Sequence, residues 1–106
     1  MVAFPAVAGA DRERLRDIFG RLRMGDVVDC TVADVAVFGA FVQIGDAPDE
    51  HLFRDGLILI SELAPGRAIS RVTDIVNVGE RVRARVILLE PEQNRIRLSL
   101  RDVPPA

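Results

Sequence analysis

Residues 25–44 read GDVVDCTVADVAVFGAFVQI, and this stretch decides the fold class. Apolar and β-branched residues dominate it, and they recur with the period of two that is typical of strands. Gly39 interrupts the run, and a glycine at such a place suits a bend or bulge between two strands. The stretch therefore predicts two strands, at about residues 26–36 and 38–44.

Three more strands are predicted further along the chain. GLILI at residues 56–60 predicts a buried third strand. RVRARV at 81–86 and RIRLSLR at 95–101 alternate polar with apolar residues, so each strand has one wet and one dry face, and PEQN at 91–94 predicts the turn between them. The predicted wet faces carry Arg81, Arg83 and Arg85 in the fourth strand, and Arg95, Arg97, Ser99 and Arg101 in the fifth.

A short helical piece is predicted around Ile69–Val76, between the third and fourth strands. Five short strands with a helical piece at this place are the make-up of the OB-fold, a small Greek-key barrel. Closure into a barrel also removes the exposed edges that so small a sheet would otherwise present. The predicted fold class is therefore all-β, a five-stranded Greek-key OB-fold barrel with a short helix between strands 3 and 4.

The N-terminal segment adds an amphipathic helix to this barrel. Leu15, Ile18, Phe19 and Leu22 lie at i, i+3, i+4 and i+7, and Asp11 suits the N-cap. Their stripe packs onto the chain's own domain or makes a dimer or partner contact, and both alternatives stay open. The predicted organisation is a disordered N-terminus (1–10), the helix (11–24), the barrel domain (25–102) and a C-terminal tail (103–106).

Charge is strongly segregated along the 106 residues, although the formal net charge is only −2. Residues 1–24 have five arginines against three acids, residues 25–63 one against eight, and residues 64–106 eight against five. The middle segment is therefore expected to be acidic. The 45–55 loop contributes Asp46, Asp49, Glu50 and Asp55, and we expect it to be merely solvated, to dock a partner or to repel RNA.

The composition also bears on location. No stretch approaches the roughly 18 to 20 apolar residues of a membrane helix, and the opening MVAFPAVAGA lacks the basic segment of a secretory signal. The single cysteine, Cys30, lies in an apolar alternating run and is expected to be a small core residue. We expect a cytoplasmic protein that does not bind membranes.

Four stretches of the chain resemble the S1 RNA-binding domain family: GDVVDCTVADVAVFGAFVQIG, DGLILISEL, VGERVRARVILLE and NRIRLSLRD. They span about residues 24–102, and FGAFV, GL-x-x-IS and R-I-x-LS follow the family's order and spacing. The resemblance implies an OB-fold whose second and third strands carry single-stranded RNA. It also implies that Ile58 and Ile60 face the barrel interior and that Leu59 faces outward.

The resemblance further implies a set of RNA-binding positions. Two aromatic positions stack on bases, an arginine opens the fifth strand, and an acidic position near the end of the fourth strand is expected to orient that arginine. A leucine stands where the family usually has a histidine. In this order the residues are Phe38, Phe41, Arg95, Glu90 and Leu59, with Arg97 adding charge. The alternative that one or both phenylalanine rings fill the barrel stays open.

Two classes of function follow. The first is an OB-fold module that binds single-stranded RNA weakly and with little sequence preference, through stacking and arginine contacts. The second is a protein-interaction module in which Phe38, Phe41 and Leu59 form an apolar patch beside the acidic 45–55 loop. Neither catalysis nor a metal or cofactor is expected, because His51 has no second histidine or cysteine nearby in the sequence. We expect a monomer or a weak homodimer.

Overall fold

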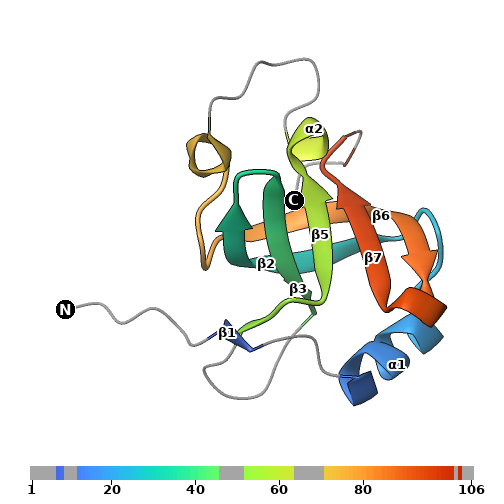
Figure 1. Ribbon diagram of the computed structural model, residues 1–106. Coiled ribbons are helices and arrows are strands. Elements are labelled where there is room, and N and C mark those ends of the chain that lie inside the picture. Colours follow the sequence, from blue (N-terminus) through green and yellow to red (C-terminus); the bar gives the residue numbers. More distant parts are fainter. Residues whose placement is uncertain (1–6, 9–11, 46–51, 64–70, 102, 104–106) are drawn as a thin grey trace.

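The predicted hairpin at residues 25–44 forms β2 (Val27–Ala36) and β3 (Gly39–Ile44). In the computed structural model, which describes residues 7–8, 12–45, 52–63, 71–101 and 103, these strands belong to a closed barrel (Figure 1). Its other strands are β5 (Gly56–Leu59), β6 (Arg81–Glu90) and β7 (Arg95–Ser99), in the order β2-β3-β5-β7-β6. Within the barrel, only β5 and β7 pair in parallel. The predicted five-stranded OB-fold barrel is confirmed.

Short elements differ from the prediction in two places. The third strand ends at Leu59, and Ile60 begins the helix α2 (Ile60–Leu63) as its amide donates to the Phe38 carbonyl. Ile60 therefore belongs to α2 and not to the strand, although it packs against the buried core as expected. Part of the helical piece predicted at 69–76 forms η1, a 3₁₀ turn at Val72–Asp74, while residues 69–70 lie outside the described ranges.

A second, two-stranded sheet lies outside the barrel. It pairs β1 (Val7–Ala8) in parallel with β4 (Leu52–Phe53). The sequence predicts no order for the first of these segments and a loop for the second. Two-residue strands carry too little periodicity to be detected in sequence, so the pairing of distant segments alone defines them.

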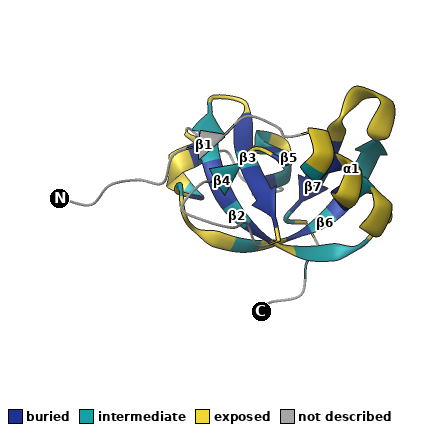
Figure 2. Cartoon of the chain, turned by 90° about the horizontal axis from the view of Figure 1, so that it is seen from below, coloured by how far each residue is buried: buried dark blue, intermediate teal, exposed yellow. Residues whose placement is uncertain are grey.

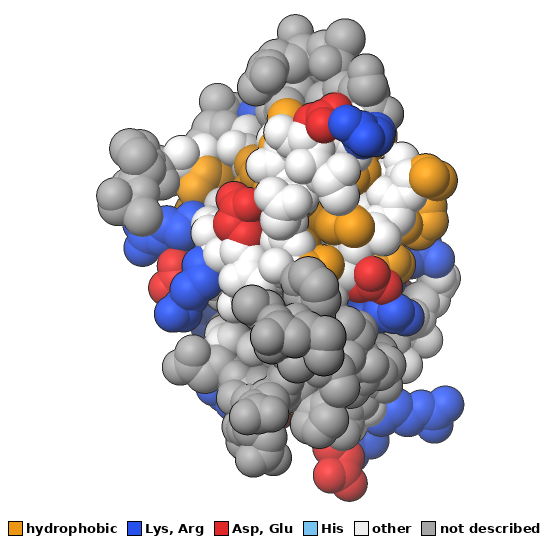
Figure 3. All heavy atoms as spheres, turned by 90° about the vertical axis from the view of Figure 1, so that its left-hand side faces the viewer, with side chains coloured by type: hydrophobic (Ala, Val, Ile, Leu, Met, Phe, Trp, Pro, Cys, Tyr) orange, Lys and Arg blue, Asp and Glu red, His pale blue; other side chains and the backbone are white. Residues whose placement is uncertain are grey.

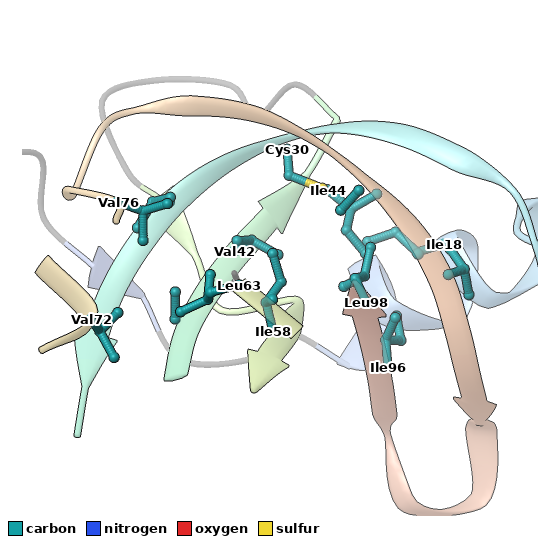
Figure 4. Close-up of a cluster of buried hydrophobic side chains, with 14 of the residues drawn as sticks. Ile18, Cys30, Val42, Ile44, Ile58, Leu63, Val72, Val76, Ile96 and Leu98 are labelled. Carbon is teal, nitrogen blue, oxygen red and sulfur yellow. The ribbon is translucent and has the colours of Figure 1, made fainter. Parts of the chain in front are cut away.

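The barrel interior is filled by the apolar sides of the strands and closed at its ends by helices. Figure 4 shows Val42, Ile58, Ile96 and Leu98 pointing into this interior. The helix α1 (Arg12–Arg21) lies at the lower end of the barrel in Figure 1, and α2 lies at the upper end. Cys30 is buried in the same cluster, as predicted.

The stripe of α1 packs onto the barrel rather than facing a partner. Leu15 and Ile18 belong to the buried core cluster, and Phe19 and Leu22 pack against it. Figure 2 shows that the outer surface of the helix stays exposed. The first of the two alternatives for this helix is therefore correct, while its predicted N-cap, Asp11, lies outside the described residues.

Ser99 belongs to the predicted wet face of β7 but is not exposed to solvent. It is buried, and its hydroxyl donates to a carboxylate oxygen of Glu62 at 3.0 Å. The backbone amide of Arg101 in turn donates to that hydroxyl at 2.9 Å. Strand periodicity places Ser99 correctly on the outer side, but α2 covers this end of the strand and supplies a polar partner.

Gly39 is required by close strand packing. A Cβ atom at this position would collide with the carbonyl oxygen of Ile58, across the β3–β5 pair. Gly56 is similarly restricted, because a Cβ there would lie 2.6 Å from a Leu98 methyl carbon. Both glycines therefore let β3, β5 and β7 approach one another closely, which brings the side chains on their outer faces together.

No helix within the described ranges is both long and apolar enough to cross a membrane.

Candidate nucleic-acid interface

Three strands bring one row of side chains together on the outside of the barrel. Phe41 of β3 lies opposite Leu57 of β5, which in turn lies opposite Arg97 of β7. These three strands face the viewer in Figure 1. Residues opposite one another on neighbouring strands have Cβ atoms about 4.5–5.5 Å apart, so an aromatic, an aliphatic and a cationic side chain lie next to one another.

Phe38 extends this row at the turn between β2 and β3. The residue is 47% exposed, and its ring meets that of the half-buried Phe41 edge to face, with 5.9 Å between the ring centres. Neither ring belongs to the core cluster. The neighbouring residues Ala40 and Val42 do belong to it. The alternative in which one or both rings fill the barrel is therefore wrong.

Arg54 adds a cation that the sequence analysis did not select. The guanidinium carbon lies 5.6 Å from the centre of the Phe41 ring, within cation–π range. One of its nitrogens also donates to a carboxylate oxygen of Asp34 at 2.6 Å. The sequence could have indicated this role only by the position of Arg54 two residues before the GL-x-x-IS motif. Its contact with Phe41 forms only when the chain folds.

A shallow hollow of about 210 Å³ lies beside Phe41. It is smaller than the roughly 300–1,000 Å³ of sites that enclose small ligands, and so resembles a groove that holds part of an extended ligand. Three of its lining residues are among the RNA-binding positions predicted from the sequence: Phe41, Arg95 and Arg97. The others are Arg54, Asp55, Gly56, Leu57, Gln93, Asn94 and Ile96.

The two other predicted site residues lie at the margin of this hollow. Leu59 pairs with Gly39 on the half-buried outer side of β5, and is thus a diagonal neighbour of Phe41. Glu90 lies opposite Arg95, and its carboxylate accepts a hydrogen bond from that guanidinium at 3.3 Å. This contact agrees with the expectation that Glu90 orients Arg95. Among the described residues, no carboxylate forms an ion pair with Arg97.

Asp55 does not contribute to an acidic surface, contrary to the expectation for the 45–55 loop. It is only 3% exposed, and both of its carboxylate oxygens accept hydrogen bonds from Arg14 of α1. Asp55, which was counted among the acidic residues of the loop, is therefore buried and its charge is neutralised by Arg14. Asp46, Asp49, Glu50 and His51 lie outside the described residues.

Other acids of the middle segment are also paired with arginines that are distant from them in the sequence. Asp29 pairs with Arg83 at 3.2 Å, and Glu62 lies 3.8 Å from Arg101. Asp34, as described above, pairs with Arg54. The segregation of charge along the chain thus does not become an acidic face over the described residues. The described part of the middle segment is therefore expected to repel the phosphates of a nucleic acid less than its sequence alone suggests.

The described part of the chain has no evident catalytic or metal-binding site. Burial raises the pKa of the Cys30 thiol to about 12, with the charges of Asp29 and Asp55 adding to the rise. The nucleophilic thiolate is therefore scarce at neutral pH. The described residues include no group of three or more His, Cys, Asp or Glu side chains placed to hold a metal ion.

Comparison with known proteins agrees with this geometry. Residues 21–101 match the family described as the S1 RNA binding domain. The small ribosomal subunit protein bS1 of Streptococcus pneumoniae is 36% identical over 89 residues, which are 84% of this chain and 20% of that protein. The polyribonucleotide nucleotidyltransferase of Acidiphilium cryptum is 37% identical over 94 residues, 89% of this chain and 12% of that enzyme. The chain thus spans a fifth or less of these relatives.

Solved structures share the barrel. A chain of the a/eIF2alpha-aDim2p-rRNA complex from Pyrococcus horikoshii superposes with a TM-score of 0.67 and 30% identity, over 78% of this chain and 46% of that one. GSP13 from Bacillus subtilis gives a TM-score of 0.65 and 27% identity, over 80% of this chain and 62% of its own.

Proposed function

The chain belongs to the S1 RNA binding domain family, and from this premise we propose that it binds single-stranded RNA across the outer face of β3, β5 and β7. The observation that carries the proposal is the exposed aromatic pair beside a groove lined by arginines. Bases stack on Phe38 and Phe41, and Arg95 and Arg97 meet phosphates. The S1 domain is a nucleic-acid-binding module, and we propose no catalysis for this chain.

Stacking on aromatic rings gives this site little sequence preference. Every base has a π face, and stacking contributes about 1–3 kcal/mol per base whatever the base is. Phe38 offers its ring at the hairpin tip, and Arg54 already covers part of the Phe41 ring. A base that stacks on the uncovered part of the Phe41 ring therefore lies beside the Arg54 guanidinium, and this adds a cation–π contribution.

The number of available cations makes the proposed binding weak. Arg54 and Arg95 each hold a carboxylate, and Arg97 faces the groove without an ion-pair partner among the described residues. We therefore expect about two to four phosphate contacts. Each contact in a single strand contributes about 0.7 to the slope of log affinity against log salt concentration. A modest slope, near 1.4–2.8, follows from these values.

A titration of fluorescently labelled single-stranded RNA of about ten nucleotides tests the proposal. It is run at two salt concentrations with oligouridine and oligoadenosine, and with an RNA duplex of the same length as control. We expect micromolar or weaker binding of both single strands, weakening with salt, and weaker binding of the duplex. Binding that does not respond to salt, or no binding of either strand, would contradict the proposal.

A protein-docking role for the same face is the second candidate, and the hairpin tip favours it. Val37 is 92% exposed beside Phe38, next to a second hollow lined by Val35, Ala36, Val37, Arg71, Val72 and Thr73. Figure 3 shows the side of the molecule next to this face, where groups of hydrophobic side chains lie among charged ones. The burial of Asp55 also removes one of the acidic residues on which this candidate depends. RNA is therefore the ligand that we favour.

The relatives of this chain also suggest the general process in which it acts. Relatives include a small ribosomal subunit protein and a polyribonucleotide nucleotidyltransferase. We propose that the chain acts in translation or RNA metabolism, in the cytoplasm, with RNA as its ligand.

A further inference from the structure

The N-terminal helix is joined to the candidate RNA face by a buried ion pair. Arg14 of α1 donates from Nε and Nη2 to the two carboxylate oxygens of Asp55, at 2.9–3.0 Å. The Asp55 side chain is fully buried and that of Arg14 is 16% exposed. Fork-shaped pairs of this kind fix both partners in one orientation, because two parallel hydrogen bonds form at once.

Backbone contacts extend this pair into the sheet. Nη2 of Arg14 donates to the Ile44 carbonyl at 2.9 Å, and the Ile44 amide donates to Asp55 at 2.8 Å. The Arg14 guanidinium also lies 4.6 Å from the centre of the Phe53 ring. Helix α1 is therefore tied to the end of β3 and to the segment just before β5.

The segment held in this way lines the groove. Arg54, Asp55 and Gly56 are consecutive lining residues of the hollow beside Phe41, and the Arg54 guanidinium lies over the Phe41 ring. A residue that fixes Asp55 thus also fixes the backbone from which Arg54 projects. The family match begins at residue 21, so Arg14 lies outside the residues that match the S1 domain.

We propose that α1 prepares the RNA face, with Arg14 as a positioning residue that holds Asp55 and thereby keeps Arg54 over Phe41. The inference rests on the proposed function. A preformed site binds more tightly because less side-chain and loop freedom is lost when the ligand arrives.

A double-mutant cycle on the full chain tests this role, with RNA affinity as the readout. Arg14→Gln, Arg54→Gln and the double variant are titrated with the same labelled oligouridine. Arg16→Gln is the matched control, because it removes an equal charge from an exposed position of the same helix. We expect R14Q to weaken RNA binding about five- to tenfold and R16Q less than twofold. In the R54Q background, R14Q should change affinity less than twofold.

A merely structural role gives a different result. If Arg14 only stabilises the fold, R14Q has a lower melting temperature, and its effect on RNA affinity does not depend on Arg54. The inference is overturned if R14Q binds RNA as R16Q does, or if its effect is equally large with and without Arg54. Should R14Q fail to fold, Arg14→Lys takes its place, because lysine keeps the charge but cannot form the fork with Asp55.

The proposed function and this inference fail in distinguishable ways. If R54Q weakens RNA binding and R14Q does not, the inference fails and the RNA proposal stands. If the wild-type chain binds no RNA, both fail.

Discussion

The rings of Phe38 and Phe41 meet at an interplanar angle of 87°, so the edge of one ring points at the face of the other. Such an arrangement contributes about 0.5–1.5 kcal/mol beyond the area it buries. It also holds Phe38 in place at a turn where a single ring would be free to rotate. The pair thus forms a fixed aromatic corner at the edge of the groove.

Replacing either ring by leucine is expected to weaken RNA binding and leave the fold intact. Leucine keeps apolar bulk at the surface but removes the stacking face, which is worth about 1–3 kcal/mol per base. We expect Phe38→Leu and Phe41→Leu each to raise the Kd about fivefold or more, as measured by fluorescence anisotropy.

Val37→Ala serves as the control for these variants. It removes exposed apolar area from the same hairpin without touching a ring. If V37A weakens RNA binding as much as the two leucine variants do, apolar area rather than stacking explains the affinity.

The strands and the position of the aromatic pair could be predicted from the sequence because both rest on local patterns. Alternation with a period of two marks β6 and β7, and the FGAFV motif sets the bend at Gly39. The apolar residues on the dry faces of these strands are buried or pack against the core, as alternation requires.

The contacts that complete the site could not be predicted, because they join residues far apart in the chain. Arg14 and Asp55 are 41 positions apart, and Arg54 and Asp34 are 20 positions apart. A count of acids along a segment treats Asp55 as surface charge, although the fold brings an arginine to it. Charge patterns therefore predict a face only after the partners are known.

Gly39→Ala is expected to destabilise the protein strongly. Its Cβ would meet the Ile58 carbonyl oxygen, and backbone atoms in a closed barrel cannot move aside as a flexible side chain can. Overpacking of this kind costs about 1–3 kcal/mol or more. The free energy of unfolding, measured by urea denaturation, should fall by at least this amount.

Gly20→Ala provides the matched comparison, with the opposite sign. Gly20 lies in α1, and a Cβ there would meet no atom within 4 Å. Alanine is favoured over glycine in a helix by about 0.5–1 kcal/mol, so this variant should be more stable than the wild type. Equal effects of the two alanine substitutions would mean that β3 and β5 are not as close as described.

Cys30 is expected to dominate the pH dependence of stability in alkaline solution. Burial raises the pKa of its thiol to about 12 in the folded state, against 9.0 ordinarily. The folded pKa is the higher one, so the stabilisation is complete below pH 9.0 and is lost as pH rises toward about 12. The free energy of unfolding should fall in this window by at most about 1.4 kcal/mol per pH unit.

The composition leaves few other side chains that titrate in this pH range. The chain has no tyrosine, and all 14 of its basic residues are arginines, which stay charged in this range. Cys30→Ala should therefore flatten the pH profile between pH 9 and pH 12, even if it lowers stability overall by leaving a small cavity. An unchanged slope in C30A would show that the thiol is not the titrating group.

Leu59→His is expected to tighten RNA binding and so to separate the two candidate functions. Leu59 lies on the outer side of β5 as a diagonal neighbour of Phe41, at the position where the resemblance to the S1 family implies a histidine. An imidazole there can stack and donate a hydrogen bond, with a net value of about 0.5–1.5 kcal/mol. The Kd for single-stranded RNA should therefore fall by up to about tenfold.

The protein-docking candidate predicts the reverse for the same variant. There Leu59 supplies apolar contact area, and an imidazole buried without a polar partner would weaken the complex while leaving RNA affinity unchanged. Leu59→Met is the control, because it keeps an apolar side chain of similar size and should leave both affinities nearly as they are. If L59H instead lowers the melting temperature by several degrees and changes no affinity, the half-buried leucine acts as part of the barrel's packing and not of its binding face.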